Sequence, residues 1–140
     1  MTRFGTHAAH FEFRSDRFDA SSELPADANA GNRFYGRDVA EFISAGLSAR
    51  GLDASFFDED WGWQVHARRS DGSVLEISVY HSQDTHADAT GEGWELMIRL
   101  LRKQRTLGFV PRFGEVELDA DAEAAVTGVF ADAGITLHRA

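Results

Sequence analysis

Apolar and polar residues alternate along two stretches in the middle of this chain. Within residues 61–69 and again within residues 73–80, apolar side chains recur at every second position. A period of two is typical of β-strands that bury one face. The tetrapeptide Ser70-Asp71-Gly72-Ser73 separates the two stretches, and its Asp-Gly pair suits the positive φ angles of a type I′ turn. We therefore predict a β-hairpin here.

Residues 94–101 fit two structures. Every second residue from Trp94 to Leu100 is apolar, as in a strand, but Met97 and Leu101 also complete a helical stripe. We predict a strand, because a two-stranded hairpin needs a third partner to be stable. Val116 and Leu118 indicate another short strand. Further strands are predicted at residues 10–14, 54–57 and 135–139.

Two other stretches have the period of an amphipathic helix. Residues 37–50 and 120–133 each place their larger apolar side chains on one side of a helix. Asp119 suits the N-cap of the second helix, and Gly51 and Gly134 suit left-handed C-terminal caps. The stripes consist of Val39, Phe42, Ile43 and Leu47 in the first helix and of Val126, Val129 and Phe130 in the second.

Together these elements predict one α+β domain over residues 1–140. We expect a single mixed or antiparallel β-sheet with two helices on one face, in the order β-α-β-β-β-β-α-β, which leaves out the short strand indicated by Val116 and Leu118. A chain of 140 residues can bury a substantial core in one domain. Residues 15–36 have little periodicity and many turn-forming residues, which predicts a long loop. We expect Phe34 and Tyr35, near its end, to dock on the domain.

Charge and composition narrow the classes of partner. The net charge of −9 disfavours a nucleic-acid or anionic-membrane surface and favours a basic partner. The chain contains no cysteine, which excludes disulfides and thiolate chemistry. No apolar run reaches membrane-spanning length, and residues 1–13 have no apolar signal-peptide core. We therefore expect a cytoplasmic protein without a membrane partner.

The segment Asp58-Glu59-Asp60-Trp61-Gly62-Trp63 is the most distinctive part of the sequence. In a strand, Trp61 and Trp63 share a face and present adjacent indole rings to one surface. Gly62 has no side chain, so another backbone can approach it closely. The tryptophans are either core anchors or a recognition platform. The matching alternation of neighbouring strands predicts that both face the helices.

Three segments of the first half also carry a family pattern: FEFRSDRF at 11–18, the helix 37–51 ending in Ala-Arg-Gly, and EDWGW at 59–63. The chain resembles a family of small uncharacterised bacterial proteins that share an F-x-x-R-S-D-x-F opening, a helix ending in A-R-G and an E-D-W-G-W motif. The resemblance implies a bacterial origin and supports the predicted fold. It supplies no catalytic residue.

One predicted loop contains four candidate metal ligands. Imidazole and carboxylate groups suit zinc or iron, and such a site would make the protein a metal-dependent hydrolase. The spacing matches no standard motif, however, and the ligands crowd a single loop without rigid neighbouring elements to orient them. We therefore expect no tightly bound metal and no cofactor. The candidates are His81, Asp84, His86 and Asp88.

A basic stretch between residues 99 and 112 contains no acid. It is either a solvated strand end and loop or a contact for RNA or another anion. Nucleic acid is the less favoured partner because the chain as a whole is acidic and few aromatic residues lie among the cations. The basic residues are Arg99, Arg102, Lys103, Arg105 and Arg112.

The first strand runs into Arg14-Ser15-Asp16-Arg17. This is either a strand-end turn pinned by ion pairs or an arginine pair that receives an anionic ligand. No nucleophile elbow, P-loop or dinucleotide fingerprint is present. We therefore expect a non-enzymatic protein-binding module, immunity- or adaptor-like, with a basic protein as partner. The predicted partner surface consists of Arg14, Asp16, Arg17, Phe34 and Tyr35.

Overall fold

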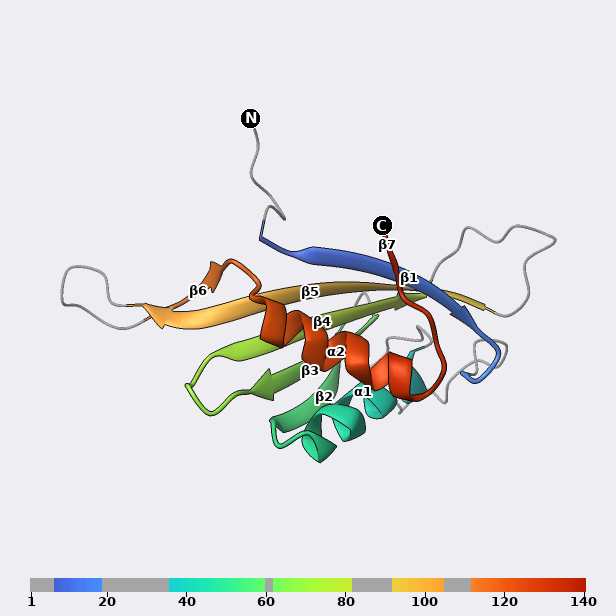
Figure 1. The fold of residues 1–140 in the computed structure, drawn as a ribbon, viewed down its shortest axis with the longest axis horizontal. Helices are drawn as coiled ribbons and strands as arrows, with labels where there is room; N and C mark the ends of the chain where they lie inside the picture. The colour runs from blue at the N-terminus through green and yellow to red at the C-terminus, as the bar shows by residue number, and fades with distance from the viewer. Residues whose placement is uncertain (1–6, 19–35, 60–61, 82–91, 105–111) are drawn as a thin grey trace.

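The computed structural model describes residues 7–18, 36–59, 62–81, 92–104 and 112–140 (Figure 1). Within these ranges the chain forms seven β-strands and two α-helices. In chain order they are β1 (Ala9–Ser15), α1 (Arg37–Ala49), β2 (Asp53–Glu59), β3 (Gly62–Arg68), β4 (Val74–His81), β5 (Glu92–Gln104), β6 (Arg112–Val116), α2 (Ala120–Asp132) and β7 (His138–Arg139).

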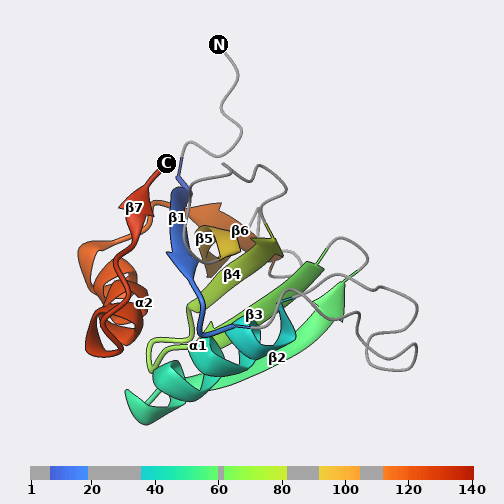
Figure 2. The same cartoon turned by 90° about the vertical axis from the view of Figure 1, so that its right-hand side faces the viewer.

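The strands form one antiparallel sheet in the order β2-β3-β4-β5-β1-β7, with β6 also paired to β5. The long strand β5 pairs with three other strands. Strands β1 and β6 pair with different parts of one side of β5, and β4 runs along its other side. Figures 1 and 2 show α1 and α2 on the same face of the sheet. The predicted α+β class, with two helices on one face, is confirmed.

The ambiguous stretch 94–101 is a strand and extends in both directions, over Glu92–Gln104. Tertiary pairing decides this, because β4 and β1 bind the two sides of β5 and the two-residue period then matches the buried face. The strand indicated by Val116 and Leu118 lies earlier, at Arg112–Val116. The final strand is shorter than predicted and consists of His138–Arg139.

The turn between β3 and β4 is one residue longer than the predicted type I′ turn. Arg69 N–H donates to Ser73 O at 2.8 Å, and Gly72 N–H donates to Arg69 O at 3.0 Å. The loop is therefore Ser70-Asp71-Gly72, and Gly72 takes a left-handed conformation with φ 86°. Asp71 Oδ1 accepts hydrogen bonds from the Ser73 N–H at 2.9 Å and the Ser73 hydroxyl at 2.5 Å, which stabilises the longer loop.

The helix-facing side of the sheet holds the core. Trp63 is only 3 % exposed, so it is a core anchor, as predicted, and not a platform. Trp61 lies outside the described residues. Gly62 allows the expected close approach, because a Cβ at this position would lie 2.6 Å from the Val79 carbonyl oxygen. Other residues predicted for this face, all buried there, are Val65, Leu75, Ile77 and Ile98.

The helix ends follow the predicted capping pattern. At the end of α1, Leu52 N–H donates to Leu47 O at 3.1 Å, and residues 130–135 repeat this Schellman geometry after α2. Asp119 caps the start of α2 by accepting the Ala122 N–H at 2.8 Å. Among the described residues, neither helix has the length and apolar character needed to cross a membrane.

Candidate functional site

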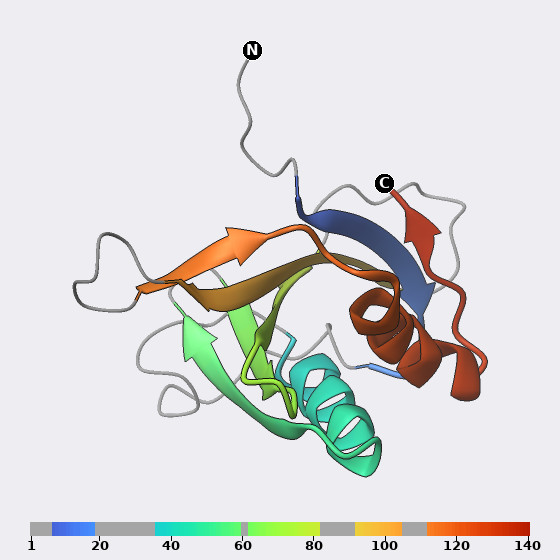
Figure 3. The ribbon, with the colours of Figure 1, turned by 60° about the vertical axis from the view of Figure 1, so that its left-hand side comes forward.

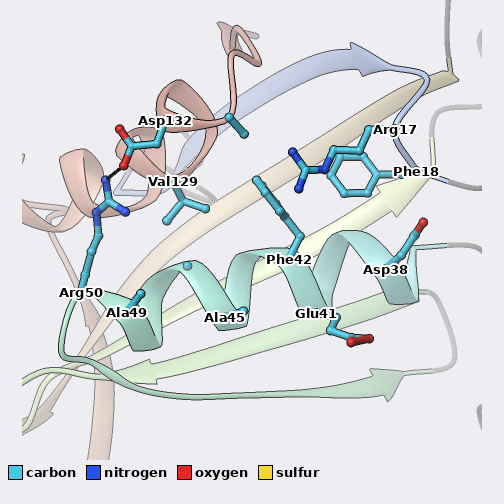
Figure 4. A pocket seen from close by; sticks show the side chains of 12 residues that line it. Arg17, Phe18, Asp38, Glu41, Phe42, Ala45, Ala49, Arg50, Val129 and Asp132 are labelled. Atoms are coloured by element: carbon cyan, nitrogen blue, oxygen red, sulfur yellow. Dashed lines mark hydrogen bonds and ion pairs between the residues drawn. The ribbon is translucent and has the colours of Figure 1, made fainter.

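The two helices meet at a glycine and leave a groove beside this contact. Gly46 of α1 lies so close to Val129 of α2 that a Cβ on Gly46 would be 2.5 Å from Val129 Cγ1. Beside this contact lies a hollow of about 770 Å³, which Arg17 and Phe18, just after β1, also line (Figure 4). Concavities of this size are typical sites for binding ligands or anchoring side chains. We call it the α1–α2 groove.

Phe42 forms the centre of the apolar lining of the groove. Its ring meets the rings of Phe18 and Phe130 edge to face, with both pairs of centroids 5.3 Å apart. The guanidinium carbon of Arg17 lies 4.7 Å from the centroid of the Phe42 ring, within the range of a cation–π contact. Ala45 continues the lining along α1. An aromatic ring beside an arginine is a combination common in interface anchors.

Acidic side chains flank the groove at both ends. Asp38 and Glu41 line it where α1 begins, and Glu41 is exposed. At the other end, Arg50 Nη2 donates to Asp132 Oδ2 at 2.7 Å and joins the last turns of the two helices (Figure 4). Among the described residues that line the groove, three carry carboxylates and two, Arg17 and Arg50, carry guanidinium groups. An incoming cation is therefore attracted to its rim.

The helical period had identified the core stripe of α1 but not the groove. Ala45 and Ala49 lie beside that stripe, one turn apart, and widen the apolar surface beyond the buried positions. This spacing was the available signal in the sequence. It could not reveal the groove, because the groove also needs α2 and the end of β1, which are distant in sequence.

Part of the predicted partner surface lies beside this groove. Ser15 Oγ accepts the Arg17 N–H at 3.1 Å and closes a local turn after β1. Arg14, Asp16 and Arg17 line a second hollow of about 440 Å³, together with the segment that follows α2. Arg17 lines both hollows, so the structure brings these three predicted residues to one continuous surface. The other two, Phe34 and Tyr35, lie outside the described residues.

Of the four candidate metal ligands, His81 is described. Its ring packs against the Trp94 indole, with centroids 4.9 Å apart. Asp84, His86 and Asp88 lie outside the described residues. Within the ranges that the structure covers, no three His, Asp or Glu side chains gather as metal ligands. The metal-dependent hydrolase therefore stays a hypothesis drawn from the sequence.

Arg99, the first cation of the basic stretch, lies within a network of carboxylates on the face without helices. It donates to Glu76 of β4 through Nε at 2.8 Å and also through Nη2, and to Glu115 of β6 through Nη1 at 3.3 Å. Burial lowers the pKa of Arg99, but the hydrogen bonds and charges of Glu76 and Glu115 outweigh this effect and leave it raised. On the neighbouring strand β3, His66 Nε2 lies 3.4 Å from Glu76 Oε2.

Two further cations of the stretch, Arg102 and Lys103, lie among the described residues. Arg102 Nη2 lies 3.4 Å from Asp71 Oδ2, so this guanidinium also has a carboxylate neighbour. Lys103 is exposed. Arg105 and the side chain of Arg112 lie outside the described residues. Arg99 and Arg102 therefore already have carboxylate neighbours, which weakens the hypothesis that this stretch binds RNA or another anion.

A further ion pair, which the sequence had not indicated, holds α2 against the β3–β4 hairpin. Arg69 binds Asp119 with both ends of its guanidinium, from Nη1 to Oδ1 at 3.1 Å and from Nη2 to Oδ2 at 2.8 Å. This pair, and then the Ala122 N–H, lower the pKa of Asp119. The two residues are 50 positions apart, so no local pattern connects them.

Comparison of the chain with protein-family models, curated proteins and solved structures found no match. Function therefore has to be argued from the chemistry and shape of the sites themselves. Among the surfaces described above, the α1–α2 groove combines a hollow, an aromatic centre and flanking charges.

Proposed function

We propose that this protein is a non-enzymatic, cytoplasmic protein-binding module of the immunity or adaptor kind, which binds a basic partner protein through the α1–α2 groove. One observation carries the proposal: an apolar hollow of about 770 Å³ centres on Phe42, and carboxylates flank it. A side chain of the partner that fills this hollow would bury apolar surface on both molecules, at about 25 cal/mol per Å².

Charge supports a basic partner. The chain carries a net charge of −9, so a basic protein is attracted over distances longer than direct contact. Glu41 lies at the rim of the groove and is exposed, where it can pair with a cation of the partner. Arg17, stacked on Phe42, is already positioned for a carboxylate or a carbonyl oxygen of the same partner.

Site-specific photo-cross-linking tests this proposal. Ala45 is exposed and lines the groove, so a photoreactive amino acid there samples whatever enters it. Glu95 is the matched control, because it is exposed but lies between the buried Trp94 and Leu96 and therefore points to the opposite face of the sheet. In the cells that make the protein, we expect a discrete protein adduct from position 45 and none from position 95.

Charge reversal completes the test. Glu41→Lys should reduce the adduct from position 45, whereas Glu95→Lys should leave it unchanged. With the partner identified and purified, its association rate should fall several-fold as ionic strength rises from about 0.01 M to 0.15 M, since screening shortens the Debye length from about 30 Å to about 8 Å. Equal adducts from both positions, or an acidic partner, would contradict the proposal.

A further inference from the structure

Among the described strands, β2 forms one edge of the sheet along its whole length (Figure 3). Its seven residues pair with β3 in an unbroken register from Asp53–Arg68 to Glu59–Gly62. In the part of the chain that the structure describes, no strand pairs with the outer side of β2. A long, regular edge presents a row of N–H and C=O groups to which another strand can add.

The register shows which backbone groups of β2 point outward. Arg69 N–H donates to Ser73 O, so Arg69 faces β4, and successive residues of an antiparallel strand face opposite neighbours. Because β3 has no bulge, its even-numbered residues face β2. Their partners on β2 are Asp53, Ser55, Phe57 and Glu59, which leaves the backbone N–H and C=O groups of Ala54, Phe56 and Asp58 pointing away from the sheet.

The side chains of β2 hold this edge in place. Ala54 and Phe56 pack against the core, and the Phe56 ring lies 6.2 Å from the Trp63 ring, centroid to centroid. Because β2 is already ordered, the binding of an added strand costs little conformational entropy in this protein. The opposite end of the sheet differs, because the short β7 pairs with β1 there and Ala140 N–H donates to His10 O at 2.9 Å.

The charges of β2 indicate what kind of strand fits. Its sequence DASFFDE has acids at both ends and no lysine, arginine or proline. Edge strands commonly avoid pairing by carrying lysine, proline or a bulge, and β2 has none of the three. An antiparallel second copy centred on Phe56 would place Asp53 opposite Glu59 of the copy, and like charges in cross-strand pairs are destabilising.

We propose that the outer edge of β2 accepts an extended, basic segment of a partner protein as an additional strand. The outward backbone groups of Ala54, Phe56 and Asp58 supply the hydrogen bonds, and the carboxylates of β2 select lysine or arginine on the added strand. The inference does not rest on the α1–α2 groove, so either surface can fail its test without affecting the other.

The experiment uses the full chain labelled with ¹⁵N and a short synthetic peptide of alternating valine and threonine with lysines at both ends. A second peptide, with glutamate in place of lysine, is the matched control. The basic peptide should shift the amide resonances of Ala54, Phe56 and Asp58 and leave those of Ala45 and Ala49 in the groove unchanged. The acidic peptide should cause no saturable shift.

A proline variant tests the direction of the hydrogen bonds. Ala54→Pro removes an outward N–H but no hydrogen bond to β3, and proline is tolerated at such edge positions. It should weaken binding of the basic peptide about tenfold, whereas Ala54→Val, which keeps the N–H, should bind like the wild type. Should Ala54→Pro fail to fold, the double variant Asp58→Lys/Glu59→Lys should lose the preference for the basic peptide over the acidic one.

Four results would overturn the proposal. They are equal binding by Ala54→Pro and Ala54→Val, equal binding of the two peptides, shifts confined to the α1–α2 groove, and absence of saturable binding. Sedimentation of the wild type adds a further check. A dimer that Ala54→Pro converts to a monomer would show that a second copy of this chain, and not a basic partner, occupies the edge.

Discussion

The contact between α1 and α2 makes a prediction that separates packing from helix propensity. Gly46 and Gly128 both lie inside helices, and alanine in a helix interior is favoured over glycine by about 1 kcal/mol at either position. A Cβ on Gly46 would lie 2.5 Å from Val129 Cγ1 and 2.9 Å from Cγ2. A Cβ on Gly128 would instead lie 2.7 Å from Nη2 of Arg50, the far end of a flexible side chain.

The two substitutions should therefore have opposite effects. Val129 strongly prefers one rotamer in a helix, and both of its methyl groups crowd Gly46, so Gly46→Ala must push the helices apart. Such overpacking costs about 1–3 kcal/mol. Gly128→Ala only displaces Arg50 from Asp132, an exposed pair worth about 0.2–1 kcal/mol. The gain in propensity is common to both, and the lost Arg50–Asp132 pair offsets part of the overpacking cost. Gly46→Ala should therefore be about 1–2 kcal/mol less stable than Gly128→Ala.

Urea unfolding followed by tryptophan fluorescence measures this difference as a shift in midpoint at constant slope. The double variant Gly46→Ala/Val129→Ala provides the control, because removing the two methyl groups makes room for the new Cβ. The double variant should be more stable than the sum of the two single effects predicts, by more than about 0.5 kcal/mol. A Gly46→Ala protein as stable as Gly128→Ala would refute the reasoning and show that the helices are not in close contact.

Three further predictions concern the core and the start of α2. Trp63→Ala should lower the free energy of unfolding by about 3–5 kcal/mol, since Trp63 is almost fully buried, and chemical denaturation measures this loss. Asp119→Ala should cost about 1–2 kcal/mol of unfolding free energy through loss of the N-cap, whereas Asp119→Ser, which caps but cannot hold Arg69 as an ion pair, should cost less. The pKa of Asp119 is lowered in the folded protein, so its carboxylate stabilises the fold above the ordinary value of 3.8. As the pH falls below 3.8 and through the lowered pKa, the stability advantage of the wild type over Asp119→Ser should therefore shrink. Measuring the unfolding free energy of both proteins across this pH range tests the prediction, and an advantage that stays constant would contradict it.

The sequence by itself determined the two helices, the β3–β4 hairpin and the buried face of the sheet. The two-residue period predicted that Trp63 faces the core, and the glycine after each helix predicted the two Schellman ends, both of which the structure contains. These features are local: a period or a cap depends on residues within one or two turns of each other. Gly62 belongs to the same class, because the absence of a side chain predicts a close neighbour whatever that neighbour is.

Only the tertiary structure decided the length of β5 and the surfaces available for binding. Residues 94–101 fit both a strand and a helix, and the pairing of β5 with β4 and β1 resolved the ambiguity. The three-residue loop of the hairpin is different, because the Asp71–Ser73 hydrogen bonds that stabilise it are local, although the Asp-Gly pair alone suited a shorter turn. Arg69 and Asp119 meet across 50 positions, a distance at which periodicity carries no information.

The α1–α2 groove and the β2 edge show the same division. The sequence contained the small residues of α1 and the acids of β2, but a groove is the space that two packed helices leave between them, and an edge is a strand that lacks a second neighbour. Both properties arise from the order in which distant segments pack. Local free-energy preferences determine the elements, whereas the relative placement of those elements is determined by burial and pairing over the whole chain.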